Sequence, residues 1–217
     1  MTCLPLKCKP LDDLLEGGIE INSITEIFGE AGTGKTNLCL QASRESAAGG
    51  KKVAYINCEG VTSERLKQLC SDNDCKSIPS DILFFNPSSF EEQEKIIKNA
   101  LDIKNLGLLV LDTFNSFYRL MLENDEKFAD RSLNRQITDL QIAAMEKGLY
   151  VIIVGQVYST KDDDVKPFGG RGIERMVNTI IKLEKKGRGK RQATIIKHKT
   201  QPKGKKSIFS ITAKGLE

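Results

Sequence analysis

Hydrophobic residues gather in short runs that alternate with longer segments of mixed polarity. Runs rich in aliphatic and β-branched residues predict buried strands at Ser23–Phe28, Lys52–Cys58, Asp81–Asn86, Gly107–Asp112 and Tyr150–Gln156. The segments between the strands have helical character, at Lys35–Ala48, Ser63–Ser71, Phe90–Lys104 and Glu123–Lys147. Such alternation predicts an α/β fold with a mainly parallel central sheet that helices cover on both faces.

The alternation of predicted strands and helices ends after the last of these strands. Val157–Gly172 has the composition of a polar loop with glycines. Three β-like runs with no helix between them follow, at Val177–Glu184, Gln192–Lys199 and Ser207–Thr212. They predict an antiparallel C-terminal extension of the sheet. A chain of 217 residues can bury one sizeable core, so we expect residues 1–217 to form a single domain.

Composition narrows the class of protein. With 39% hydrophobic and 29% charged residues, the chain is typical of a water-soluble globular protein. No apolar run reaches the roughly 20 residues of a membrane span, and the N-terminus lacks the apolar stretch of a secretion signal. We therefore expect a cytoplasmic protein with no membrane partner. The 6 cysteines form no CxxC pair and there is 1 histidine, which favours free thiols over a zinc site.

A complete phosphate-binding loop lies between the first predicted strand and the first predicted helix. It reads Gly29-Glu30-Ala31-Gly32-Thr33-Gly34-Lys35-Thr36. The glycines let the loop curl so that its backbone N–H groups point at phosphate oxygens, and the helix N-terminus adds its dipole. Lys35 is expected to reach the β- and γ-phosphates and Thr36 to ligate Mg²⁺. The motif in this context predicts binding of a nucleoside triphosphate.

Polar residues follow three of the predicted strands. Asp112 ends the run Leu108–Leu111, where a Mg²⁺-associated carboxylate belongs, although an aspartate capping a buried strand is also common. Glu59 follows another strand and can orient and deprotonate an attacking water, or it is a turn glutamate. Gln156 can sense the γ-phosphate and signal to the following loop, or it faces solvent.

Four segments carry a resemblance to a known family: Leu11–Glu20, Ile24–Glu30, Tyr55–Gly60 with Glu64–Leu66, and Phe209–Leu216. They resemble the ATPase core of archaeal and eukaryotic RecA/Rad51-family recombinases over nearly the whole chain. The match starts at this core, so we do not expect the helical N-terminal domain of full recombinases or the linker whose phenylalanine docks into the next subunit. With its basic Lys197-His198-Lys199 segment, the chain most resembles the archaeal paralogues of these recombinases.

The resemblance implies a RecA-like P-loop NTPase core, ATPase activity, and ATP and Mg²⁺ as cofactors. It implies that Glu59, Lys35 and Gln156 act in catalysis and that Asp112 holds Mg²⁺ through water. Arg65 matches an arginine that packs on the adenine ring, a role suited to a planar guanidinium.

The resemblance also implies two DNA-facing loops, Asn115–Asp130 and Val157–Arg175. In the first loop, Arg119 is the expected phosphate contact. In the second loop, the acidic triplet Asp162-Asp163-Asp164 is expected to weaken DNA binding or to hold cations near the loop. The expected DNA contacts of the second loop are Lys166, Arg171 and Arg175.

Basic residues crowd the segment from Lys182 to Lys206, in which Glu184 is the acidic exception. Clustered cations suit a polyanion because neutralised phosphates release counterions. The alternative is a solvated hairpin. The expected DNA contacts of this segment are Lys185, Lys186, Arg188, Lys190 and Arg191.

Lys197 and Lys199 resemble paired lysines that, in bacterial RecA, reach the γ-phosphate of a neighbouring subunit. They lie two apart on a predicted strand, so we expect both side chains to leave the same face and to act in trans. The alternative is a pair of solvated lysines.

Taken with the resemblance, the residues predict an accessory protein of homologous recombination and DNA repair. It is expected to bind DNA with little sequence preference, to hydrolyse ATP weakly and to promote no strand exchange of its own. Expected partners are DNA, the main recombinase or other repair proteins, and further copies of the chain. The main alternative is a signalling or clock-type ring ATPase of the same superfamily, which touches no DNA; a small-molecule kinase is the third reading.

Overall fold

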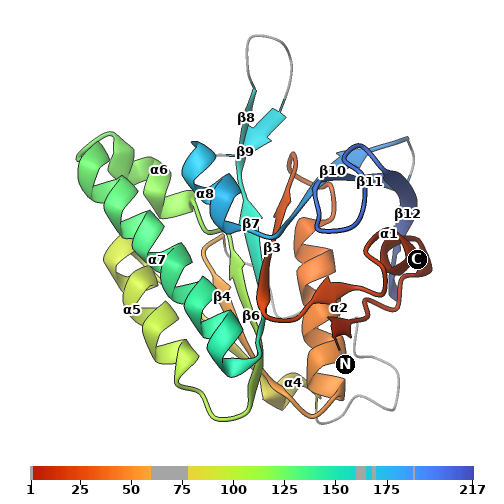
Figure 1. The fold of residues 1–217 in the computed structure, drawn as a ribbon, viewed down its shortest axis with the longest axis horizontal. Helices are drawn as coiled ribbons and strands as arrows, with labels where there is room; N and C mark the ends of the chain where they lie inside the picture. The colour runs from red at the N-terminus through yellow and green to blue at the C-terminus, as the bar shows by residue number, and fades with distance from the viewer. Residues whose placement is uncertain (1, 60–77, 160–164, 168–169, 188) are drawn as a thin grey trace.

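The computed structural model describes residues 2–59, 78–159, 165–167, 170–187 and 189–217. A 9-stranded sheet runs through its centre in the order β13-β12-β11-β10-β3-β7-β6-β4-β5 (Figure 1). Its strands are β3 (Ser23–Phe28), β4 (Lys52–Asn57), β5 (Ile82–Phe85), β6 (Leu106–Asp112), β7 (Tyr150–Gly155), β10 (Thr179–Lys185), β11 (Lys190–Lys197), β12 (Lys206–Thr212) and β13 (Gly215–Leu216).

The two parts of the sheet differ in strand direction, as the sequence predicts. β3, β4, β5, β6 and β7 pair in parallel, and β11, β12 and β13 are joined by antiparallel pairs. β10 links the two parts because it pairs in parallel with β3 and antiparallel with β11. The parallel part includes β3 and β6, in which every residue is buried, as expected for strands covered on both faces.

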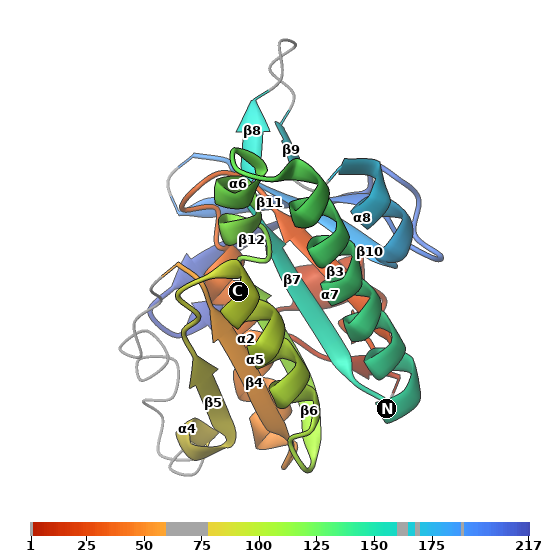
Figure 2. The same ribbon diagram turned by 90° about the vertical axis from the view of Figure 1, so that its left-hand side faces the viewer.

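Helices cover both faces of the sheet, which gives three layers. α2 (Lys35–Ala48) and the short α1 (Lys9–Leu14) lie on one face. α5 (Phe90–Leu101) and α7 (Glu126–Lys147) lie side by side across the other face, as Figure 2 shows. α4 (Ile78–Asp81), α6 (Ser116–Leu122) and α8 (Gly170–Met176) are short. In the described ranges, none of the helices combines the length and the apolar character that crossing a membrane requires.

Alternation along the strands divides the core between these layers. On β3, Ile27 belongs to the cluster that contains Leu38 of α2, whereas Ile24 belongs to the cluster that contains Ile137 of α7. Burying apolar side chains stabilises the fold by roughly 25 cal/mol per Å² of apolar surface removed from water. The two clusters therefore hold the sheet rigidly between its helices, and the strand ends that carry polar residues are fixed in position.

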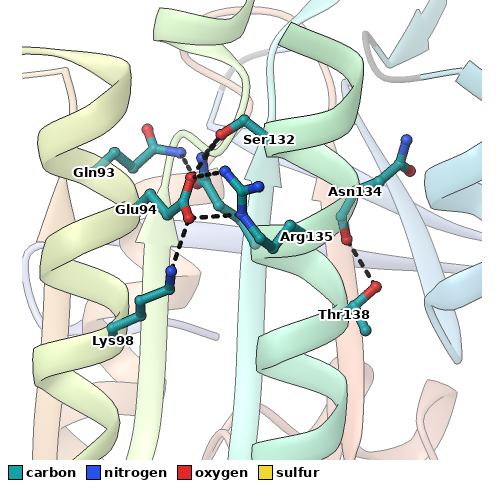
Figure 3. A network of polar contacts seen from close by, with 8 residues as sticks. Gln93, Glu94, Lys98, Ser132, Asn134, Arg135 and Thr138 are labelled. Atoms are coloured by element: carbon teal, nitrogen blue, oxygen red, sulfur yellow. Dashed lines mark hydrogen bonds and ion pairs between the residues drawn. The ribbon is translucent and has the colours of Figure 1, made fainter. Parts of the chain in front are cut away.

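A network of polar contacts joins α5 to α7 (Figure 3). Glu94 of α5 accepts hydrogen bonds from Nε and Nη2 of Arg135 at 2.7 and 2.8 Å, and from Ser132 Oγ at 2.8 Å. Lys98 Nζ lies 2.9 Å from the same carboxylate. These hydrogen bonds, those from Arg135 foremost, lower the pKa of Glu94 to about 2. The network clamps the outer helical layer together.

Several boundaries differ from those predicted. Asp125 caps α7 by accepting a hydrogen bond from the Phe128 N–H, so this helix begins at Glu126 and not at Glu123. The predicted loop Asn115–Asp130 is mostly helical, because α6 and the start of α7 occupy it.

Other elements were not predicted from the sequence. Within the stretch predicted as a polar loop, β8 and β9 form a hairpin and α8 begins. Near the N-terminus, β1 pairs antiparallel with β2. These elements are β8 (Val157–Ser159), β9 (Val165–Pro167), β1 (Cys3–Leu4) and β2 (Ile19–Glu20).

The cysteines of the described residues are free thiols, as predicted. They are Cys3, Cys8, Cys39 and Cys58. The predicted helix Ser63–Ser71 lies outside the described residues.

Candidate functional site

The carboxyl ends of the parallel strands meet at one edge of the sheet. The register pairs Phe28 of β3 with Gly155 of β7, and Asn57 of β4 with Asp112 of β6. The phosphate loop, Glu59, Asp112 and Gln156 each follow or end one of these strands, so the topology brings them together. In open α/β sheets this edge is where ligands bind.

The phosphate loop has the backbone geometry that its glycines allow. Gly29 has φ 152° and Gly34, which precedes the first residue of α2, has φ 104°. A Cβ on Gly29 would lie 2.2 Å from the Leu183 carbonyl oxygen, and one on Gly34 would lie 2.7 Å from Cδ1 of Ile211. Gly29 therefore requires glycine for space as well as for conformation, and Gly34 requires it for its positive φ. The loop leads directly into α2, whose N-terminal N–H groups face it.

The Lys35 ammonium is folded back into the loop. Its Nζ donates hydrogen bonds to the carbonyl oxygens of Gly29 at 2.7 Å and Glu30 at 3.0 Å. Burial lowers the pKa of Lys35, while the charges of Glu59 and Asp112 act in the opposite direction. A desolvated ammonium at the mouth of the loop is suited to phosphate oxygens, which compensate its charge better than carbonyl oxygens do.

Asp112 holds two hydroxyl groups on one carboxylate oxygen. Its Oδ2 accepts hydrogen bonds from Thr36 Oγ1 at 3.0 Å and from the Tyr55 hydroxyl at 2.8 Å. Burial raises the pKa of Asp112, and the hydrogen bonds from Tyr55 and Thr36 lower it. The structure thus brings together the two residues predicted to attend Mg²⁺.

This pair of oxygen-bearing side chains fits Mg²⁺, a hard cation that takes oxygen ligands and keeps several waters. In the described residues, the protein forms no group of three or more His, Cys, Asp or Glu side chains that can hold a metal ion. That agrees with Mg²⁺ binding through Thr36, nucleotide phosphates and water, with Asp112 behind them. The described residues alone do not supply a full set of ligands.

Tyr55 is a residue of this site that the sequence analysis missed. It lies in the middle of β4 and is fully buried. A buried tyrosine requires a partner for its hydroxyl, so a tyrosine in an otherwise apolar strand was the available signal. Its partner, Asp112, lies on the neighbouring strand, and only the strand order reveals the contact.

Glu59 and Gln156 also come together, at the exposed side of the site. Glu59 Oε1 accepts hydrogen bonds from Gln156 Nε2 and, at 3.1 Å, from Thr113 Oγ1. The Gln156 side-chain oxygen in turn accepts a hydrogen bond from Arg119 of α6. Gln156 therefore connects the candidate catalytic carboxylate to a residue predicted to contact DNA. Its backbone is held by Asn115, whose Oδ1 accepts from the Gln156 N–H at 2.8 Å.

The predicted DNA contacts are spread over several elements. Arg175 is exposed on α8, and Lys185, Lys186 and Lys190 are exposed on or beside the β10–β11 hairpin. Arg191 is half-buried on β11. For Lys166 and Arg171 only the backbone is described, in β9 and α8, and Arg65 and Arg188 lie outside the described residues.

The lysine pair predicted to act in trans has a different geometry from that expected. β11 ends at Lys197, so Lys199 lies beyond the strand and the inference that both leave one strand face is wrong. Lys197 Nζ donates hydrogen bonds to the carbonyl oxygens of Val177 at 2.6 Å and Glu174 at 2.9 Å, at the C-terminal end of α8. Lys199 is 76% exposed, with its Nζ 3.9 Å from a carboxylate oxygen of Glu20.

Comparisons with known proteins agree on one family. The sequence model described as Rad51 matches residues 1–217. The chain is 42% identical over 214 residues to "DNA repair and recombination protein RadB" of Methanococcoides burtonii, covering 96% of this chain and 95% of the relative. It is 36% identical to the RadB protein of Thermoplasma acidophilum, covering 95% of this chain and 90% of the relative.

A solved structure described as "Crystal structure of the RadB recombinase" superimposes with a TM-score of 0.85. The identity is 31%, and the alignment covers 98% of each chain. The agreement of sequence and fold over nearly the full length, with a phosphate loop and its carboxylates in place, shows that the chain belongs to the Rad51 family of recombinases, in the RadB group.

Proposed function

We propose that this protein is an ATP-binding and DNA-binding accessory of homologous recombination and DNA repair. The observation that carries the proposal is the hydrogen-bonded series Glu59–Gln156–Arg119, which links the nucleotide site to a candidate DNA contact. The RadB relatives named for DNA repair and recombination support it. Weak ATP hydrolysis without strand exchange is the activity we propose for it.

The geometry supports a different role in ATP hydrolysis for each residue of the site. Lys35 leaves the Gly29 and Glu30 carbonyls and neutralises the β- and γ-phosphates. Glu59 orients the attacking water and accepts its proton. When bound, Mg²⁺ neutralises charge on the phosphate oxygens. Thr36 and Asp112 place that cation, and Tyr55 fixes the Asp112 carboxylate.

The same contacts support the slow turnover that we propose. Glu59 Oε1 accepts hydrogen bonds from Gln156 and Thr113, so this oxygen can take a proton from the attacking water only after one of them is exchanged for water. A γ-phosphate offers acceptor oxygens to the Gln156 amide. We propose that this exchange frees Glu59, and that DNA phosphates drawn to Arg119 favour the same rearrangement.

For DNA, the cations predicted from the sequence are the proposed contacts. Lys and Arg side chains bind phosphates without reading sequence, so binding should be nearly independent of sequence and strongly dependent on salt. The cations come from α6, from the segment around α8 and from the β10–β11 hairpin. They are Arg119, Lys166, Arg171, Arg175, Lys185, Lys186, Arg188, Lys190 and Arg191.

We propose further that residues 1–217 work as one ATPase core in the cytoplasm. Proposed protein partners are the main recombinase, other repair proteins and further copies of this chain. A trans role for Lys197 and Lys199 is part of this proposal, although Lys197 must first leave α8. Mixing Lys197→Ala/Lys199→Ala protein with Lys35→Ala protein tests it: recovered turnover supports trans action, and wild-type turnover of the lysine variant alone rules it out.

The deciding experiment is fluorescence-anisotropy binding to single-stranded DNA, with and without ATP, over a series of salt concentrations. We expect affinity to fall steeply with salt, and Arg119→Ala/Arg175→Ala to bind more weakly than the wild type at each concentration. Lys52→Ala/Lys104→Ala, which removes two exposed lysines at the opposite end of the sheet, is the charge-matched control. If the wild-type protein does not bind DNA at low salt, the proposal is wrong and a ring ATPase that touches no DNA becomes the favoured function.

A further inference from the structure

The β10–β11 hairpin lies over the phosphate loop. A Cβ built on Gly32, at the tip of the loop, would lie 3.4 Å from Lys185 Nζ and 3.3 Å from Lys185 Cε. Arg191 Nε donates a hydrogen bond to the Gly32 carbonyl oxygen at 3.1 Å. Two cations of the segment that the sequence assigned to DNA therefore lie against the nucleotide site.

The sheet register explains why these two cations face the loop. Lys185 and Arg191 are direct partners across the antiparallel pair of β10 and β11, so their side chains leave the same face of the sheet. The β10 strand is fixed above the loop because it pairs in parallel with β3, the strand that leads into the loop. Lys186 follows the end of β10 and Lys190 begins β11, and both are exposed at the turn.

Two of the cations at this place lack an acidic partner: among the described residues, no carboxylate forms an ion pair with Lys185 or Arg191. Lys35, whose charge Glu59 and Asp112 offset in part, adds a third cation from within the loop. The backbone N–H groups of the loop add partial positive charge. Like charges gathered around one concave backbone repel one another unless an anion lies among them.

We propose that Lys185 binds the phosphates of a nucleoside triphosphate held in the phosphate loop of its own subunit, and that Arg191 is a positioning residue that fixes the tip of the loop through the Gly32 carbonyl. The proposal rests on the proposed function, in which the loop binds ATP. It divides the hairpin cations into a nucleotide-facing pair and an outward-facing remainder that includes Lys186 and Lys190. Lys185 would then neutralise phosphate charge within its own subunit. Lys197 does not do so in this structure, because its ammonium is hydrogen-bonded to carbonyl oxygens at the end of α8.

The test is MgATP affinity of the full chain by isothermal titration calorimetry at low salt. Because charge-assisted hydrogen bonds are the strong ones, we expect Lys185→Ala and Lys185→Gln each to weaken ATP binding by about tenfold. Arg191→Ala should also weaken it, and Arg191→Lys, which keeps a cationic donor, should recover part of the loss with no change in melting temperature. Lys206→Ala, an exposed lysine on the neighbouring β12, is the matched control and should bind ATP like the wild type.

The outcomes separate this proposal from the function on which it rests. If wild-type protein binds ATP and Lys35→Ala does not, the loop is the nucleotide site; wild-type affinity in both folded Lys185 variants then overturns the role of Lys185 alone. An Arg191→Ala variant that loses ATP affinity only in proportion to a lower melting temperature overturns the positioning role. Failure of the wild type to bind ATP overturns both proposals.

Discussion

Asp112 and Glu59 both lie at the carboxyl ends of neighbouring strands, yet their surroundings differ. Asp112 is 1% exposed, and hydroxyl groups from β4 and α2 are fixed on one of its oxygens. Glu59 is exposed, and its partners Thr113 and Gln156 follow the ends of β6 and β7. The same sheet edge thus carries a buried half and an exposed half.

In the proposed function, the two halves have different roles: the buried half binds nucleotide and Mg²⁺, and the exposed half responds to a bound ligand. In the buried half, packing fixes the groups that attend Mg²⁺, so little beyond the Lys35 side chain has to move when nucleotide arrives. In the exposed half, a series of hydrogen bonds joins the side chains. A ligand can replace the donors of these hydrogen bonds one at a time. Changes to the buried half should therefore affect nucleotide and metal binding, whereas changes to the exposed half should affect turnover and its dependence on DNA.

Lys35→Ala should give the largest effect. The loop would lose the side chain that neutralises the β- and γ-phosphates, so we expect ATP affinity to fall by at least about 100-fold. Gln156→Ala, in the exposed half, should keep ATP affinity within about tenfold of the wild type. Calorimetric titration of both variants makes the comparison, and equal affinity in Lys35→Ala and the wild type would contradict the site.

Asp112→Asn should have the next largest effect, on Mg²⁺ dependence. Asparagine retains an acceptor oxygen for Thr36 and Tyr55 but removes the negative charge behind the cation. We expect turnover to need a higher Mg²⁺ concentration and to fall by about tenfold or more at a fixed one. Steady-state ATPase assays over a Mg²⁺ series measure this, and an unchanged Mg²⁺ profile would show that Asp112 is structural.

Glu26, a buried carboxylate on β3, extends the comparison to a second buried acidic group. It is 1% exposed, and among the described residues its Oε1 has no hydrogen-bond partner. Burial, with a smaller effect from Glu174, raises the pKa of Glu26 to about 8. Since the folded protein holds this proton more tightly than the unfolded chain does, stability should fall as pH rises from the unfolded pKa, about 4.3, toward 8.

Glu26→Gln removes that titration. We expect the variant to exceed the wild type in unfolding free energy by about 1–3 kcal/mol at pH 8, and the difference to shrink toward pH 5. Urea unfolding at both pH values measures it, with Glu174→Gln as the control for the neighbouring charge. A difference between wild type and variant that does not change with pH would contradict the protonated state of Glu26.

Arg135→Ala should give the smallest effect, because the clamp to Glu94 lies at the surface. Arg135 is 51% exposed, so we expect a loss of about 0.5–1 kcal/mol in unfolding free energy. The lowered pKa of Glu94, about 2, sets the sign of the pH dependence. The contribution should be complete above about pH 4.3 and should disappear as pH falls toward 2, so wild type and variant should converge in acid.

Much of the sheet could be predicted because its signals are local. β3 and α2 have the predicted bounds, since the phosphate loop separates them and Gly49 follows the helix. α8 was missed because it is short and rich in glycine, and α6 because the resemblance placed a loop there. In both cases tertiary packing decides the structure more than local preference does.

The site shows the same limit. The loop and the strand-end residues Asp112, Glu59 and Gln156 were found from motif and position. The contact of Tyr55 with Asp112 and that of Arg191 with Gly32 depend on strand order and register, which join residues far apart in the sequence. A run of lysines and arginines indicates a polyanion, but it does not show which cations face nucleotide and which face outward.

The most direct test of the division between binding and response is Glu59→Gln, measured for ATP affinity and for turnover on the same preparation. Glutamine can still accept hydrogen bonds from Gln156 and Thr113 but is a far weaker base, so the buried half should be undisturbed. We predict ATP affinity close to that of the wild type together with loss of turnover. Loss of ATP binding in the folded variant, or wild-type turnover, would contradict the account.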